Sequence, residues 1–309
     1  MKKIFIDGKA GTTGLRIEER LAARRDIEII SLPETLRKDA EARRQALNGA
    51  DVVFLCLPDD AAREAVSMIE NDTTTVIDTS TAHRTNPAFA YGFPELGEEF
   101  YEKIKNSKRI AVPGCHACGF IALVHPLIKA GILAPDTPLS VHSITGYSGG
   151  GKKMIAEYES DSVSDYLLAP RQYGIAQAHK HIPEMMKISG IEKAPIFSPI
   201  VSNFYSGMEV TVPLFAETLK YGGASDIAKI YASTYNTPIV KFRGTNDEGG
   251  FLSAARYSGL DTMSVELYGS EERILLVARY DNLGKGASGA AVECLNIKLG
   301  CELTEGLET

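Results

Sequence analysis

The chain has 309 residues, of which 24% are charged and 8% aromatic, and its formal net charge is -7. This length is sufficient for two domains, each with a hydrophobic core. The acidic balance argues against a nucleic-acid-binding protein, because domains of that kind are usually basic.

The cysteines and the N-terminus indicate the cellular compartment. Five cysteines, an odd number, are scattered along the chain without the spacing of a disulfide framework. The first residues enter strand-like sequence directly, without the apolar stretch and cleavage site of a signal peptide. No uninterrupted apolar run reaches membrane-spanning length. We therefore expect a cytoplasmic protein with neither a membrane nor a nucleic acid as partner.

A glycine-rich turn follows the first predicted strand. Residues 4–6 are apolar, 8–14 have G-x-x-G-x-x-G spacing, and 15–23 have helical periodicity. Glycines at such a turn let a pyrophosphate approach the backbone at a helix N-terminus. The alternative is a glycine-rich turn that binds no ligand. The candidate cofactor contacts are Gly8, Gly11, Thr12, Thr13 and Gly14.

The residues after the second predicted strand carry conflicting signals about the cofactor. Glu34 lies about twenty residues after the glycine turn, the spacing at which NAD-binding proteins carry an acid. Ser31, Arg37 and Lys38 lie just past the same strand, where cations suit the 2′-phosphate of NADP. A solvated helix face explains the two cations equally well, because charges of both signs alternate there. We favour NADP, since Glu34 follows a proline and is expected to have left the pocket.

Strands and helices alternate over the first hundred residues. The runs at 50–58 and 74–80 are nearly continuous in apolar or β-branched residues, as in strands buried on both faces of a parallel sheet. This alternation predicts an α/β, Rossmann-like, doubly wound domain, in which ligands lie beyond the carboxyl ends of the strands. Besides the glycine turn, that edge collects Leu57, Pro58, Ser80 to Arg84, and Cys115.

Cys115 is predicted to lie where a strand turns into a helix. Residues 110–112 are apolar, Pro113 and Gly114 break the strand, and 121–128 have helical spacing. A thiol there is close to the unpaired N–H groups of the first helical turn, which favour the thiolate. This position suits a nucleophile. The alternative is a small apolar residue packed beneath the helix.

The second half predicts an α+β domain with a mostly antiparallel sheet. Strand-like segments occur at 139–145, 210–215, 264–268 and 274–278. The first is followed by a glycine-rich loop whose backbone N–H groups and lysines suit a phosphate or a carboxylate. A flexible solvated loop is the alternative. The candidate substrate contacts in it are Ser148, Gly149, Lys152 and Lys153.

His179 and His181 lie two residues apart, on the same face of an extended segment. One of them is a candidate acid/base for the chemistry of the thiol. With Cys115 and Cys118 they could instead form a zinc set. Surface histidines, or histidines satisfied in the core, are the remaining alternative.

Together and in this order, the segments resemble the N-acetyl-gamma-glutamyl-phosphate reductase family in its shorter form. The matching segments are 8–14, 78–84, 91–96, 113–115, 148–152, 179–184 and 281–286. Aspartate-semialdehyde dehydrogenases share the glycine turn, the cysteine and the segment 281–283, but are not expected to carry the histidine segment. The chain departs from the family at His83, where phenylalanine is common, and at Lys152, where arginine is common.

The resemblance implies a reaction. N-acetyl-L-glutamyl 5-phosphate would be reduced with NADPH to N-acetyl-L-glutamate 5-semialdehyde and phosphate, through a thioester on Cys115, in arginine biosynthesis. The backbone N–H groups of Cys115 and His116 are candidate oxyanion donors, and His179 or His181 would move the proton. Another acyl-phosphate reductase, or a Rossmann dinucleotide-binding module without catalysis, is the alternative.

The resemblance also implies further contacts and an organisation of the chain. Asn282 would contact the nicotinamide, Tyr173 would hydrogen-bond the substrate, and Arg84 would join the lysines in binding its anionic groups. Residues 1–114 and 282–309 would form the dinucleotide-binding domain. Residues 115–281 would form the catalytic domain, in a homodimer or homotetramer.

Overall fold

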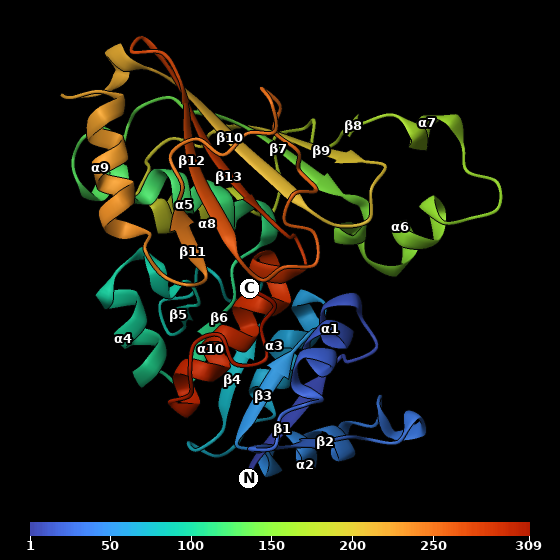
Figure 1. The fold of residues 1–309 in the computed structure, drawn as a ribbon. Helices are drawn as coiled ribbons and strands as arrows, with labels where there is room; N and C mark the ends of the chain where they lie inside the picture. Colours follow the sequence, from blue (N-terminus) through green and yellow to red (C-terminus); the bar gives the residue numbers. More distant parts are fainter. The chain divides into compact units, whose positions relative to one another are not determined.

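The computed structural model describes residues 1–309 and divides into two compact units (Figure 1). The first comprises Met1–Pro94, Glu98–Pro113 and Ala287–Leu307. The second comprises Glu95–Gly97, Gly114–Gly286 and Glu308–Thr309. Residues 282–286, expected in the dinucleotide-binding domain, therefore belong to the second unit. None of the helices has the length and apolar character needed to cross a membrane.

The first unit is built on a six-stranded sheet of order β2-β1-β3-β4-β6-β5, in which every pairing is parallel. Its strands are β1 (Lys2–Asp7), β2 (Ile27–Ile30), β3 (Val52–Leu55), β4 (Thr75–Asp78), β5 (Ala90–Tyr91) and β6 (Arg109–Ala111). Its helices are α1 (Thr12–Leu21), α2 (Ala40–Gly49), α3 (Asp59–Ser67), α4 (Glu98–Asn106) and α10 (Gly289–Leu299), with a short 3₁₀ turn, η1 (Glu34–Leu36). The predicted doubly wound α/β domain is confirmed, and the strand order reverses between β1 and β3, where such sheets bind ligands.

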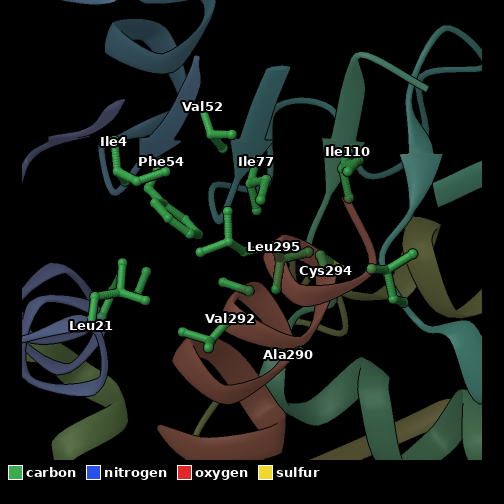
Figure 2. Close-up of a cluster of buried hydrophobic side chains, with 14 of the residues drawn as sticks. Ile4, Leu21, Val52, Phe54, Ile77, Ile110, Ala290, Val292, Cys294 and Leu295 are labelled. Carbon is green, nitrogen blue, oxygen red and sulfur yellow. The ribbon is translucent and has the colours of Figure 1, made fainter. Parts of the chain in front are cut away.

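Helix α10, from the C-terminal end of the chain, completes the core of the first unit. Its residues from Gly289 to Ile297 are all buried, including the polar Glu293 and Asn296. Figure 2 shows Ala290, Val292, Cys294 and Leu295 grouped with apolar side chains of β1, β3, β4 and β6. The sheet therefore buries one face against a segment almost two hundred residues later in the sequence.

The second unit is built on a seven-stranded sheet of order β11-β12-β13-β10-β7-β9-β8. Its strands are β7 (Ser140–Gly146), β8 (Arg171–Gln172), β9 (Ile196–Ser202), β10 (Met208–Phe215), β11 (Val240–Phe242), β12 (Met263–Gly269) and β13 (Arg273–Tyr280). Its helices are α5 (Cys115–Lys129), α6 (Gly151–Tyr158), α7 (Asp165–Leu168), α8 (Ile182–Ser189) and α9 (Ala224–Thr234). Short turns are η2 (Pro94–Leu96), η3 (Tyr147–Gly150), η4 (Ala216–Thr218) and the π-helical η5 (Gly284–Ser288).

The second sheet is mixed, so the predicted mostly antiparallel sheet is wrong. The pairs β7/β9 and β11/β12 are parallel, and the others are antiparallel. Parallel neighbours need a long crossover connection. The segment carrying α6, α7 and α8 supplies it between β7 and β9, and residues 243–262 supply it between β11 and β12. Strand patterns located β7, β10, β12 and β13 but not β8, β9 and β11. Because β9 and β11 are the parallel partners of β7 and β12, the parallel pairs could not be expected.

Helix α5 is the central helix of the second unit and packs against α8, α9, β10 and β13. It contains Pro126, which has no N–H to donate to the carbonyl of Ala122 four residues earlier. The hydroxyl of Tyr235, the residue after α9, donates to that carbonyl at 2.7 Å. A buried backbone acceptor that the proline would leave without a partner is therefore satisfied by a side chain.

This arrangement makes the Tyr235 hydroxyl a test of stability. We expect Tyr235→Phe to lower the free energy of unfolding by about 1–3 kcal/mol, because Ala122 then buries an unsatisfied carbonyl. Tyr221→Phe is the matched control: its hydroxyl donates to the carbonyl of Ala130 at the end of the same helix, but the side chain is 58% exposed. Water can replace that bond, so the control should change stability little. Equal losses for the two variants in urea unfolding would contradict this account.

Candidate active site

Cys115 is the first residue of α5 and is half-buried. No side chain caps this helix start. The N–H of Gly114, just before the cysteine, donates to Glu184 Oε1 of α8 at 2.8 Å. The hydroxyl of Tyr280 at the end of β13 donates to the Cys115 carbonyl at 2.5 Å and accepts from the Gly119 N–H at 2.9 Å. Two elements distant in sequence therefore fix the backbone that carries the predicted nucleophile.

His116, the next residue, is buried between two hydroxyl groups. Its Nδ1 lies 2.6 Å from Ser143 Oγ of β7, and its Nε2 lies 2.5 Å from the hydroxyl of Tyr173. Only the backbone N–H of His116 was predicted to have a role, and Ser143 was not among the predicted site residues. The place of the histidine beside the cysteine was the one signal available, because the partner on β7 is set by the fold.

The two predicted histidines lie against this ring. Ring centroids of His179 and His181 are 5.8 Å and 5.7 Å from that of His116, and 4.7 Å from each other. The ring of Tyr173 is 5.9 Å from that of His179. Tyr173, His179 and His181, all predicted site residues, are thus gathered around the residue that follows Cys115.

Burial keeps the imidazoles of His116 and His179 neutral. It lowers the pKa of His116 to about 3, with a smaller effect from His179. Burial, with Lys180 as the second cause, also lowers the pKa of His179. Burial and then the charge of Cys115 raise the pKa of Tyr173, so its phenol stays protonated. The site therefore holds neutral rings, each with one donor and one acceptor nitrogen, and a phenol close to the thiol.

A second part of the site lies where η3 meets the end of β13. The amide of Asn282 donates from Nδ2 to Ser148 Oγ at 3.0 Å and accepts from the Gly207 N–H at 2.9 Å. A Cβ on Gly149 would lie 3.3 Å from the same Nδ2. Asn282, predicted to contact the nicotinamide, thus positions the glycine-rich loop that was predicted to bind substrate. Lys152 and Lys153 are exposed in the first turn of α6.

The loop after Asn282 is tied down by a buried ion pair. Lys285 Nζ lies 2.9 Å and 2.8 Å from the two carboxylate oxygens of Glu95. A Cβ on Gly286 would lie 3.2 Å from Cys115 Cβ. Glycine is therefore the residue that lets this loop pass beside the cysteine. The sequence analysis did not single out this pair, whose members are far apart in the chain.

The first unit contains a pocket of 510 Å³ at the ends of β1 and β2. Of the predicted cofactor contacts, Gly8, Ser31, Arg37, Lys38 and Leu57 line it; Lys9 and Arg43, which the sequence analysis missed, line it too. Glu34 also lines the pocket, so the expectation that it leaves the pocket is wrong. The short turn η1 keeps it there, with Oε1 4.0 Å from the Arg37 guanidinium.

The glycine turn has the shape that a phosphate group needs. Gly8 has φ +85°, and a Cβ there would lie 2.2 Å from the carbonyl oxygen of Cys56. Helix α1 begins after Gly11 without a side-chain cap, and Thr12 Oγ1 is buried without a hydrogen-bond partner. Gly11, Thr12, Thr13 and Gly14 form or precede the first turn of this helix. These N–H groups and the hydroxyl fit a dinucleotide pyrophosphate.

The polar side chains of the loop after β4 are hydrogen-bonded to other groups of the first unit. Asp78 accepts from Ser80 Oγ at 2.8 Å and lies 2.6 Å from His83 Nδ1. Arg84, predicted to bind substrate, is buried in the first unit and donates to the carbonyls of Val112 and Thr79 at 2.9 Å and 2.8 Å. The Arg84 guanidinium therefore holds the backbone of this loop. Ser80 and Pro58 lie outside the residues that line the pocket.

The zinc alternative gains no support. No group of three or more His, Cys, Asp or Glu side chains has an arrangement that could hold a metal ion. All five cysteines are thiols.

Comparison with known proteins gives matches over both units. Residues 115–282 match the family model "Semialdehyde dehydrogenase, dimerisation domain", and residues 19–105 match "Semialdehyde dehydrogenase, NAD binding domain". The chain is 46% identical over 308 residues to an N-acetyl-gamma-glutamyl-phosphate reductase of Brucella ovis, covering 96% of this chain and 99% of the relative. It is 44% identical over 306 residues to one from Sinorhizobium medicae, with 96% and 98% coverage.

Solved structures show the same fold at low identity. Aspartate semialdehyde dehydrogenase II from Vibrio cholerae, complexed with ASA, aligns with a TM-score of 0.72 at 15% identity, covering 97% of this chain and 98% of that one. Aspartate semialdehyde dehydrogenase with NADP from Candida albicans aligns with a TM-score of 0.68 at 15% identity, with 96% and 98% coverage. These two comparisons establish the fold.

The buried histidine next to Cys115 predicts a pH dependence of stability. Between the ordinary histidine pKa of 6.5 and the native value of about 3, the unfolded chain binds a proton at His116 that the native chain does not. The free energy of unfolding should therefore fall as the pH falls through this window, and the contribution is complete above it. In His116→Gln, the slope of that free energy against pH should decrease by up to about 1.4 kcal/mol per pH unit.

The measurement is urea unfolding at a series of pH values between about 4 and 7. His142→Gln is the control, because this histidine lies on the same strand as Ser143 but is exposed. It should keep the wild-type slope. The same slope in wild type and His116→Gln would show that His116 does not stay neutral in the folded chain.

Proposed function

Because the chain belongs to the N-acetyl-gamma-glutamyl-phosphate reductases of the semialdehyde dehydrogenase family, we propose that Cys115 carries out their reaction as the nucleophile. The chain is an NAD(P)-dependent oxidoreductase of the phosphorylating type. Its substrate would be N-acetyl-L-glutamyl 5-phosphate, and its products N-acetyl-L-glutamate 5-semialdehyde and phosphate. The observation that carries the residue assignment is the position of Cys115 at the start of α5, next to His116, whose ring contacts those of His179, His181 and Tyr173.

The first step would form a thioester. The Cys115 sulfur attacks the carbonyl carbon of the acyl phosphate, a C–S bond forms, and the C–O bond to phosphate breaks. The helix start favours the thiolate because its first N–H groups carry partial positive charge. The backbone N–H groups of Cys115 and His116 are the proposed donors to the oxygen that becomes negative.

The second step would release the aldehyde. NADPH supplies the hydride to the thioester carbon when it is bound. The C–S bond then breaks and Cys115 leaves as a thiolate. A histidine acts as the general acid and base at the substrate oxygen. We assign this role to His179, because its Nδ1 accepts the backbone N–H of His181 at 3.2 Å. A neutral ring with Nδ1 as acceptor has its proton on Nε2, where it can donate.

Because neutral imidazoles carry no positive charge, other groups must bind the anionic phosphate and carboxylate of the substrate. Lys152 and Lys153 are exposed at the start of α6 and follow directly on the loop that Asn282 holds. We propose that these lysines, with Ser148 and the N–H of Gly149, bind the phosphate and carboxylate of the substrate. Tyr173, a protonated phenol near the thiol, would hydrogen-bond the acyl group. The substrate role predicted for Arg84 is still only a proposal. Its geometry does not support that role, because the guanidinium already donates to the carbonyls of Val112 and Thr79.

For the cofactor, we propose NADP rather than NAD. The first unit is an NAD(P)-binding domain, and its pocket places Ser31, Arg37 and Lys38 just past β2. Lys9 Nζ lies 3.3 Å from Ser31 Oγ, which adds a third cation. A 2′-phosphate would give these cations a further acceptor, beside Glu18, which pairs with Lys9 at 3.1 Å, and Glu34, which lies 4.0 Å from Arg37.

Two further proposals concern the assembly and its surroundings. We propose a homodimer or homotetramer formed by the second unit, whose family model is described as a dimerisation domain. We also propose the cytoplasm as its location, because a nucleophilic thiol must stay reduced.

Replacing the nucleophile tests the thioester route. Cys115→Ser should lower the phosphate-dependent reduction of NADP by N-acetylglutamate semialdehyde by at least about a thousandfold. NADP binding, followed by titration calorimetry, should be retained, because the pocket lies in the first unit. Cys301→Ser, at another half-buried thiol, should keep full activity. Turnover by Cys115→Ser within tenfold of wild type would exclude the covalent route. Aspartate semialdehyde, assayed in parallel, should turn over far more slowly.

Removing the two pocket cations tests the cofactor. Arg37→Ala/Lys38→Ala should raise the KM for NADP by about tenfold or more, equivalent to about 1.4 kcal/mol. The KM for NAD should change less than about twofold, since NAD lacks the 2′-phosphate. Arg63→Ala/Lys105→Ala removes the same charge from exposed positions of the first unit outside the pocket and should have no effect. Equal rises for NAD and NADP would mean that these cations do not select the cofactor.

A further inference from the structure

Helix α5 carries a second thiol that the proposed mechanism does not use. Cys118 lies three residues after Cys115 and is completely buried. The two residues form a C-x-x-C sequence at a helix start, an arrangement that supports reversible disulfides in redox proteins. If residue 118 only filled space in the core, another small apolar residue would serve. Packing therefore does not explain why a thiol lies three residues after the nucleophile.

Both cysteine side chains face the same segment of the second unit. Cys118 Sγ lies 3.7 Å from the carbonyl oxygen of Lys285, and Cys115 Cβ lies 3.2 Å from where a Cβ on Gly286 would be. Both thiols also act on one phenol: burial first, then Cys118 and Cys115, raise the pKa of Tyr280. The two side chains therefore project from the same side of the helix toward the segment Lys285–Gly286.

Helix geometry permits a bond between the two sulfurs. Residues three apart in an α-helix have Cα atoms about 5 Å apart, within the range found in disulfides. Cys115 is the first residue of the helix, so its N–H has no i−4 partner within the helix. Because Gly286 has no side chain, the Cys115 sulfur has room to rotate. The Cβ atoms of such residues are about 5–6 Å apart in a helix, against about 3.5–4.5 Å in a disulfide. The first turn therefore has to tighten, and the hydrogen bonds from Gly114 to Glu184 and from Tyr280 to Cys115 have to adjust with it.

We propose that Cys118 is the resolving thiol of Cys115, and that a hydroperoxide converts the pair into an intramolecular disulfide. The Cys115 thiolate attacks the O–O bond of the peroxide, an S–O bond forms, and hydroxide or an alkoxide leaves and takes up, from the solvent, the proton that the thiol lost on ionising. The Cys118 sulfur then attacks the Cys115 sulfur, the S–S bond forms, the S–O bond breaks, and water leaves with the Cys118 proton. Two thiols are oxidised, one peroxide is reduced, and a dithiol reverses the change.

The consequence is protection of the nucleophile. A sulfenic acid on Cys115 without a partner would proceed to sulfinic and sulfonic acids, which are irreversible. The disulfide stops this sequence at a stage from which reduction restores the thiol. This consequence rests on the proposed function, because it takes Cys115 to be the residue whose loss stops turnover. Formation of the disulfide itself does not depend on that function.

Mass spectrometry after hydrogen peroxide treatment tests the proposal directly. Trypsin releases Cys115 and Cys118 in one peptide, residues 110–129. After brief treatment, most of the wild-type peptide should be lighter by two hydrogens, and dithiothreitol should restore its mass and at least about nine-tenths of the activity. In Cys118→Ala the same peptide should gain two or three oxygens, and activity should not return. Cys294→Ala, which removes an equally buried thiol from α10, should behave as wild type.

The outcomes separate this proposal from the proposed function. A wild-type peptide that gains two or three oxygens, with no loss of two hydrogens, would overturn the resolving role. The wild-type peptide alone decides this, even if Cys118→Ala does not fold. A disulfide in a chain that does not reduce the acyl phosphate would support the thiol pair and remove the proposed function. An active enzyme whose peptide never becomes lighter by two hydrogens would support the proposed function and overturn the thiol pair.

Discussion

The first turn of α5 is held from two sides, and the chemistry of the second unit depends on that constraint. Glu184 accepts the N–H of Gly114, and the Tyr280 hydroxyl bonds both the Cys115 carbonyl and the Gly119 N–H. These bonds fix the Cys115 thiol at a helix start, where the first N–H groups carry partial positive charge. They also determine where the neighbouring His116 projects.

Burial around this turn also keeps the neighbouring imidazole of His116 neutral. His116 is enclosed by Ser143, Tyr173 and two further histidine rings, and the cost of burying charge keeps it neutral. A neutral ring donates once and accepts once, so the hydrogen bonds of the cluster order the Tyr173 hydroxyl without placing a positive charge beside the thiol. The proposed reaction then relies on the helix start, rather than on an imidazolium, to favour the thiolate.

Much of the fold and part of the site could be predicted from local sequence. Alternating buried strands and helices predicted the doubly wound sheet, and a strand–turn–helix pattern predicted the position of Cys115. The direction of β7 relative to β9 could not be predicted, because it depends on how a crossover of about fifty residues packs. Glu34 was misplaced for a similar reason: a proline suggests that the chain turns, but the 3₁₀ turn that follows keeps the acid in the pocket.

The sequence by itself determined which groups are present and where strands give way to helices, because hydrophobic periodicity and the conformational limits of glycine and proline act over a few residues. It thus determined a glycine turn after β1 and a cysteine at a helix start. Only the tertiary structure decided the partners: Glu184 and Tyr280 for the turn at Cys115, Ser143 and Tyr173 for His116, and the segment at Lys285 for Cys118. Those contacts join residues far apart in the chain, and their distances exist only once the sheet of the second unit has formed.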